Sequence, residues 1–89
     1  MHIKSFDDLR NLMFPLELKS FKSSAGDRQL LIRLNYDNDL NGAVISVAEF
    51  AYEVMPLMDQ GLVRGAVLNT HDDSWLEEIN SYLEHFEPV

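Results

Sequence analysis

The stretch "RQLLIRLNYDNDLNGAVISVAEF", residues 28–50, decides the fold because its periodicity changes along its length. At its beginning, Leu30, Ile32 and Leu34 occupy alternate positions, which is typical of a strand with one buried face. The polar residues that follow favour a turn. Next, "GAVIS", residues 42–46, predicts the returning strand of a hairpin.

A helix is predicted to begin directly after this second strand. Ser46 and Glu49 have the spacing of a capping box, in which two side chains satisfy free backbone N–H groups at a helix start. The apolar positions that follow share one face of such a helix: Val47, Phe50, Ala51, Val54 and Met58. Pro56 would kink or restart this helix, and Gly61 would end it.

The same capping pattern occurs twice more in the chain. Ser5 with Asp8 predicts a helix over residues 6–13, and Thr70 with Asp73 predicts a helix over residues 71–86. In the second of these helices, the apolar residues at helical spacing are Trp75, Leu76, Ile79, Leu83 and Phe86.

A further strand is predicted ahead of the opening stretch, over residues 15–21, where Leu16 and Leu18 alternate with Glu17 and Lys19. Residues 64–69 are either a short fourth strand or an extended loop that covers the sheet edge. The sequence therefore predicts an α+β fold, with a three-stranded antiparallel β meander packed against about three helices in the order α-β-β-β-α-α. A free edge of such a meander allows pairing across a two-fold axis, so both a monomer and a homodimer are consistent with it.

Length and composition indicate one ordinary globular domain, residues 1–89. Hydrophobic residues make up 46% of the chain and charged residues 25%, and there is no cysteine. No apolar run approaches the roughly 20 residues that cross a bilayer, and the first residues lack the apolar centre of a signal peptide. These features predict a cytoplasmic protein.

The net charge of −8 is distributed unevenly along the chain. Residues 1–34 hold six bases and four acids, which gives +2, whereas residues 35–89 hold one base and eleven acids, which gives −10. Such a negative lobe argues against direct binding to nucleic acid or to an anionic membrane. It is either a surface for solubility or a surface for a basic partner.

No arrangement of residues typical of catalysis is present. The chain has no nucleophile elbow, no phosphate-binding loop and no dinucleotide fingerprint. Its histidines match no zinc spacing, and helix capping accounts for "HDD", residues 71–73, as well as a metal site would. We therefore expect no enzymatic activity, no cofactor and no metal.

Two groups of residues are candidates for contact with a partner. Asp73, Glu77 and Glu84 fall within about 40° of one another on the wheel of the predicted last helix, and Asp72 precedes them. The polar turn after the first strand of the opening stretch is the second group: Asn35, Tyr36, Asp37, Asn38 and Asp39. Each group is either an ordinary solvated surface or a presented contact surface.

The segment "QLLIRLNYD", residues 29–37, resembles the second strand and following turn of small acidic phage anti-CRISPR proteins that block the PAM-reading site of Cas9. "VIS", residues 44–46, resembles their third strand and the start of the next helix. The resemblance implies that Asn35 and Asp37 contact Cas9, together with the acidic region at residues 69–78. It also implies a mechanism, in which carboxylates occupy the places of DNA phosphates or of the bases that arginines read.

Three functions are therefore expected from the sequence. The first is a phage-encoded inhibitor that mimics nucleic acid and occupies the basic DNA-binding site of a host nuclease such as Cas9. The second is an immunity or antitoxin protein that neutralises a basic nuclease toxin by the same electrostatics. The third is a non-enzymatic accessory protein that binds through an apolar surface or a sheet edge, with the charge serving only solubility.

Overall fold

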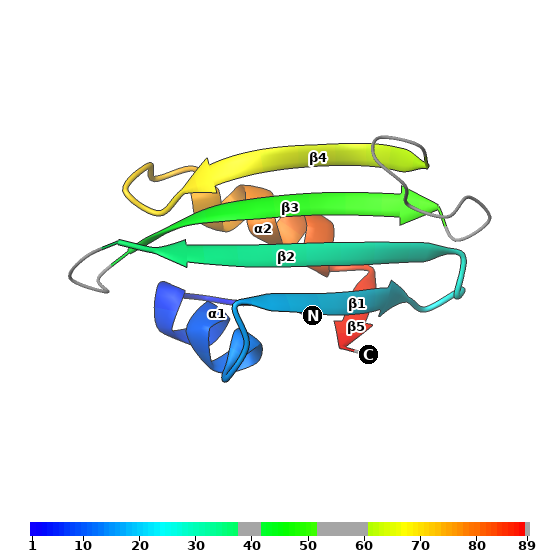
Figure 1. Cartoon of the computed structure of the whole chain (residues 1–89), viewed down its shortest axis with the longest axis horizontal. Coiled ribbons are helices and arrows are strands. Elements are labelled where there is room, and N and C mark those ends of the chain that lie inside the picture. The colour runs from blue at the N-terminus through cyan, green and yellow to red at the C-terminus, as the bar shows by residue number, and fades with distance from the viewer. Residues whose placement is uncertain (38–41, 52–60, 89) are drawn as a thin grey trace.

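The computed structural model describes residues 1–37, 42–51 and 61–88. Within these residues, the elements follow one another as α1 (Phe6–Met13), β1 (Leu18–Ser23), β2 (Arg28–Tyr36), β3 (Ala43–Ala51), β4 (Leu62–Asn69), α2 (Trp75–Leu83) and β5 (Phe86–Pro88). The strands form one antiparallel sheet in the order β4-β3-β2-β1-β5 (Figure 1).

The predicted arrangement of three helices on a three-stranded meander is wrong. The sheet has five strands, and the described residues contain two helices. The largest difference lies at residues 47–51, which continue β3 where a helix was predicted to begin. The capping role of Ser46 is therefore also wrong. The rest of that predicted helix, with Val54, Pro56 and Met58, lies outside the described residues.

Glu49 explains why the sequence of β3 resembles a helix. Buried and partly buried positions alternate along this strand, so Glu49 occupies a core-facing position and is only 8% exposed. Its carboxylate accepts a hydrogen bond from Nε of Arg64 on β4 at 3.0 Å, and Nε of Arg28 on β2 lies 4.0 Å away. A buried carboxylate is tolerated when a cation and a hydrogen bond compensate its lost hydration. Because an acidic residue occupies this core-facing position, the alternation of apolar and polar side chains that is typical of a strand is broken at Glu49.

Of the two alternatives for residues 64–69, the strand is correct. They belong to β4, which pairs with β3 from Val44 opposite Asn69 to Phe50 opposite Leu62, with a bulge at the Phe50 end. β4 therefore covers the edge of the sheet that a three-stranded meander would have left open.

The strand predicted over residues 15–21 begins and ends later, at Leu18 and Ser23. Its inward-facing positions also differ from those that the apolar pattern suggested. Phe21 is fully buried, whereas Leu18 is 49% exposed on the other face of the sheet. Lys19 points toward the helices, because its ammonium donates to the carbonyl oxygen of Leu12 at 2.7 Å.

The first helix is confirmed with the predicted bounds. The hydroxyl of Ser5 accepts a hydrogen bond from the backbone N–H of Asp8, and Oδ2 of Asp8 accepts one from the backbone N–H of Lys4. These contacts satisfy N–H groups that a helix start leaves free. Leu9 and Met13 then project from α1 into the core.

The last helix is shorter than predicted, because α2 begins at Trp75 and ends at Leu83. The predicted cap at Thr70 is wrong, since its hydroxyl accepts instead from the backbone N–H of Ala43 on β3. The chain leaves α2 before Phe86, and β5 pairs with β1. Pro88 lies in this short edge strand, where proline is tolerated because it cannot donate to the ladder.

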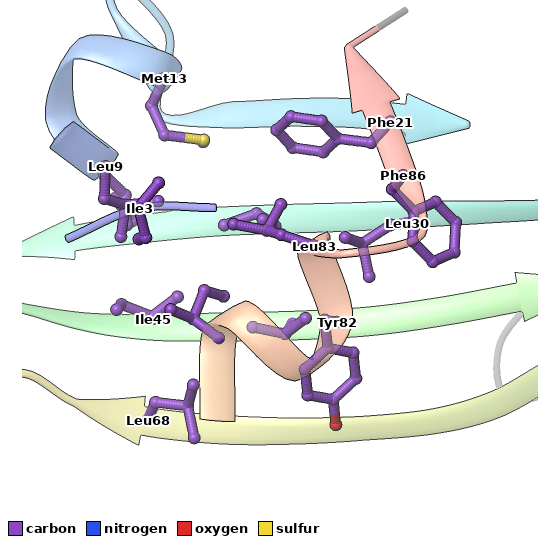
Figure 2. Packing of buried hydrophobic residues seen from close by; sticks show 14 of the residues in the cluster. Ile3, Leu9, Met13, Phe21, Leu30, Ile45, Leu68, Tyr82, Leu83 and Phe86 are labelled. Carbon is purple, nitrogen blue, oxygen red and sulfur yellow. The ribbon is translucent and has the colours of Figure 1, made fainter. Parts of the chain in front are cut away.

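The core lies between the sheet and the two helices, which contribute Leu9, Met13, Ile79 and Leu83 (Figure 2). The large, fully buried side chains of the sheet are Phe21, Leu30, Ile32, Leu34 and Ile45. The opposite side of the sheet, called the open face from here on, carries exposed apolar side chains from three strands: Leu18, Val44 and Val67.

Asn80 fastens the start of the chain to α2. Its side-chain oxygen accepts from the backbone N–H of Ile3, and its side-chain nitrogen donates to the carbonyl oxygen of Ile3, each at 2.8 Å. Asn80 is 9% exposed and Ile3 is 4% exposed, so both hydrogen bonds are largely shielded from water. The Asn80 side chain thus satisfies both backbone groups of Ile3, as a neighbouring strand would do in a sheet.

Replacing Asn80 with Ala should lower the free energy of unfolding by about 1–2 kcal/mol, because both backbone groups of Ile3 lose their partner. The loss of stability should not exceed this range, because the N-terminal segment can move into water, where the backbone groups of Ile3 become hydrated. Urea unfolding monitored by circular dichroism measures the change, with Asn11→Ala on the exposed side of α1 as the matched control. Equal stability of the two variants would contradict the role assigned to Asn80.

Candidate functional site

Two connections that carry candidate residues lie at the same end of the sheet (Figure 1). The β2–β3 connection carries Asp37, and the β4–α2 connection carries His71. Oδ2 of Asp37 lies 3.2 Å from Nε2 of His71. The backbone between these connections is also joined, because the N–H of Thr70 donates to the carbonyl oxygen of Ala43 at 3.1 Å. Two segments more than 30 residues apart in the sequence thus meet, and their meeting point is called the corner from here on.

Gly42 permits this close approach. A Cβ atom at this position would lie 2.6 Å from Oγ1 of Thr70, 3.0 Å from Oδ2 of Asp37 and 3.2 Å from Nε2 of His71. Any larger residue would therefore require the Thr70 hydroxyl and the facing side chains of Asp37 and His71 to shift. No sequence pattern identified Gly42 as important, because the contact forms only in the folded chain.

The remaining residues of the predicted turn have different environments. Asn35 is exposed at the end of β2, whereas Tyr36 is half-buried and its ring meets that of Phe6 edge-on, with the centroids 6.3 Å apart. The Tyr36 ring is thus packed against the core rather than presented freely. Asn38 and Asp39 lie outside the described residues.

Asp72 and Asp73 are exposed just before α2. Asp72 accepts hydrogen bonds from both the backbone N–H and the hydroxyl of Ser74, at 3.1 and 2.9 Å. The backbone hydrogen bond and, to a smaller extent, the hydroxyl hold the pKa of Asp72 below its usual value, against the weaker opposing effect of burial. Asp72 therefore remains ionised over the whole physiological pH range.

The outward side of α2 is acidic along its length. Glu77 and Glu84 are exposed as predicted, and Glu78, which was not among the candidates, is exposed beside them. The corner and this helix side together form the acidic surface, a term used from here on for Asp37, Asp72, Asp73, Glu77, Glu78 and Glu84.

Cations provide little compensation for the acidic surface. The sequence from residue 65 to residue 89 contains six acids and no Lys or Arg. Arg64 is already engaged, since its guanidinium pairs with Glu49, donates to the carbonyl oxygen of Ser81 at 3.1 Å and lies 4.1 Å from the ring centroid of Tyr82. Among the described residues, the Glu84 carboxylate at the C-terminal end of α2 lies 3.2 Å from Nε2 of His85.

A separate hollow of about 390 Å³ lies at the other end of the sheet. It is lined by Ser23, Arg28, Glu49, Arg64, His85 and Phe86. The sequence did not reveal it, because Arg28, Glu49 and Arg64 come from three different strands. Here the Glu49 carboxylate is held by Arg64, so it serves as a structural ion pair. In the described part of the chain, no group of three or more His, Cys, Asp or Glu side chains could hold a metal ion.

Comparison with protein-family models, with curated proteins and with solved structures found no match. The class of this protein is therefore described from its fold and its surface alone. It is a small α+β domain with a five-stranded antiparallel sheet, two helices on one side of that sheet in its described residues, and exposed acidic side chains before α2 and along its outward side. None of the described helices is long and apolar enough to span a membrane.

Proposed function

We propose that the protein binds and inhibits a basic nucleic-acid-binding protein, such as a nuclease, and that the acidic surface is the contact. The observation that carries this proposal is the contact between Asp37 and His71, which brings the β2–β3 connection beside the connection that carries Asp72 and Asp73. Carboxylates fixed on a folded scaffold can replace phosphates in a basic channel without a large loss of conformational entropy.

The spacing of the carboxylates supports the same proposal. Glu84 directly follows the last residue of α2 and lies two helical turns after Glu77, which corresponds to ~10 Å along the helix axis. Asp72 and Asp73 extend the charge beyond the helix start. A partner that binds the sugar–phosphate backbone through Lys and Arg encounters a comparable row of negative groups.

The resemblance to anti-CRISPR proteins makes a Cas9-type nuclease the first partner to test. Asn35 and Asp37, which that resemblance singles out, lie at the end of β2 beside the corner. The helix that the resemblance implies after Ser46 is replaced by the continuation of β3. The proposal therefore rests on the acidic surface and extends to other basic nucleases, including a toxin that an immunity protein would neutralise.

Reversing two charges of the acidic surface should weaken binding at least tenfold, which corresponds to about 1.4 kcal/mol. The variant Asp73→Lys with Glu77→Lys changes only exposed side chains, so its fold should persist. The partner would be captured from a native host lysate, identified, purified and titrated by calorimetry. Association should also slow steeply with salt, since the Debye length falls from ~10 Å at 0.1 M to ~3 Å at 1 M.

The matched control for this experiment is Glu17→Lys with Glu87→Lys. Both of these residues are exposed, and the net charge changes by the same amount outside the acidic surface. If the control weakens binding as much as the first variant, only net charge matters and the surface has no specific role. If neither variant changes the affinity, the proposed function is wrong.

The open face favours a second candidate function, that of an accessory interaction protein. Leu18 and Val67 are 49% and 73% exposed there, and exposed apolar side chains gathered on one face are typical of contact surfaces. In that case, substitution of Val67 with Lys should abolish partner binding, whereas charge reversal on the acidic surface should not affect it.

A further inference from the structure

A groove runs between α2 and the start of the chain, with a volume of about 600 Å³. Its floor is formed by Ile3, Asn80 and the half-buried Leu76. Asn80 holds Ile3 in place through the two 2.8 Å hydrogen bonds, so the groove is preformed. Grooves of this size are within the range of ligand-binding clefts.

The rim of the groove is charged on both sides. Glu77 and Glu84 project from α2 on one side, with Ser81 between them, and Lys4 lies on the other side. No Lys or Arg lies within ion-pair distance of Glu77 among the described residues. The groove thus combines the apolar side chains of Ile3 and Leu76 with an acidic rim on its α2 side, a combination that solubility alone does not require.

We propose that this groove receives a basic amphipathic segment of the partner protein. An apolar side chain of that segment rests on Ile3 and Leu76, and flanking Lys or Arg side chains pair with Glu77 and Glu84. The inference rests on the proposed function and adds the chemistry of the partner. Charge complementarity supplies the orientation, and the apolar floor supplies affinity that persists at high salt.

Two synthetic peptides test the inference without knowledge of the partner. Each has about 14 residues, roughly four helical turns. The first has leucines at helical spacing among lysines, and the second has serines in place of those leucines. The leucine peptide should bind about tenfold or more tightly than the serine peptide, because burial of one leucine side chain accounts for that ratio.

Variants of the rim should change this binding in opposite directions. Ser81→Trp places a large side chain in the groove and should reduce the affinity for the leucine peptide to that for the serine peptide. Lys4→Glu removes a like charge and adds an opposite one, so the leucine peptide should bind about two- to fivefold more tightly. Glu77→Lys with Glu84→Lys should weaken both peptides, whereas the control Glu17→Lys with Glu87→Lys should preserve the ratio between them.

The position of binding is measured by two-dimensional ¹H–¹⁵N NMR, and thermal melts confirm that each variant is folded. The largest shifts are expected at residues 2–4 and along α2. Equal affinity for the two peptides, an unchanged affinity in Ser81→Trp, shifts confined to the open face, or no binding would each overturn the inference. Equal affinity with shifts at Asp72 and Asp73 would reject the groove while leaving the proposed function intact. The proposed function has its own test: it is wrong if charge reversal on the acidic surface does not affect binding of the captured partner.

Discussion

Leu83→Ala and Ile79→Ala should each lower the free energy of unfolding by about 2–5 kcal/mol. Both side chains are fully buried on the side of α2 that faces the sheet, so truncation removes buried apolar area and leaves a cavity. A domain of this size has a total stability of roughly 5–15 kcal/mol. Either change should therefore lower the melting temperature by more than about 10 °C.

The matched controls lie on the opposite side of the same helix. Glu77→Ala and Glu84→Ala change exposed residues, so each should alter the stability by no more than about 0.5 kcal/mol. Thermal and urea unfolding of the four variants give the ranking. A ranking in which the glutamate variants are the less stable pair would mean that α2 is rotated about its axis, and both the acidic surface and the groove would be lost as binding sites.

Glu49→Ala should destabilise the protein by about 2–3 kcal/mol. Removal of one partner from a buried ion pair costs roughly 3–5 kcal/mol when the remaining charge is isolated from water. The side chain of Arg64 is 43% exposed, which allows partial hydration and places the expected loss below that range. Arg64 also keeps its hydrogen bond to Ser81 and its position over the Tyr82 ring.

A double variant separates the ion pair from the packing of its side chains. Glu49→Leu with Arg64→Met replaces both charges with apolar groups of similar length, and such replacements are often neutral. The double variant should therefore be more stable than Glu49→Ala in urea unfolding. If it is less stable, the charges themselves stabilise β3 and β4, and the account given for the buried carboxylate would be wrong.

The failed prediction for residues 47–51 has a definite physical cause. A carboxylate is normally expected on the solvent side of an element, so Glu49 was placed there. Val47, Phe50 and Ala51 then share one face of a helix. In the fold, Glu49 faces inward because Arg64, fifteen residues further along, supplies its countercharge. The contact between strands outweighed the local helix propensity. It could not be predicted from the residues near Glu49 in the sequence, because Arg64 is not among them.

The late start of α2 has a similar cause. Thr70 and Asp73 have the spacing of a capping box, and in an isolated peptide they would satisfy free N–H groups. In the folded protein the Thr70 hydroxyl accepts from the N–H of Ala43, because the two connections meet at the corner. The backbone reverses there, and the helix begins only at Trp75.

The candidate site was predicted in part. Exposure of Glu77 and Glu84 follows from helical periodicity and agrees with the structure, whereas Asp72 and Asp73 are exposed in the turn before α2 and not on the predicted helix. That Asp37 belongs to the same surface does not follow from any periodicity, because the contact with His71 spans 34 residues. The groove was missed for the same reason, since its floor joins residues from opposite ends of the chain.

By itself, the sequence determined the features that depend on neighbouring residues. These are the first helix with its Ser5 cap, the buried side of β2, the inward side of α2 and the excess of acids after residue 34. Only the tertiary structure decided the length of β3, the pairing of Glu49 with Arg64, and the joining of the corner to the acidic side of α2. Each of these arises from partners distant in sequence, and the energy of such a contact exists only after the chain has folded.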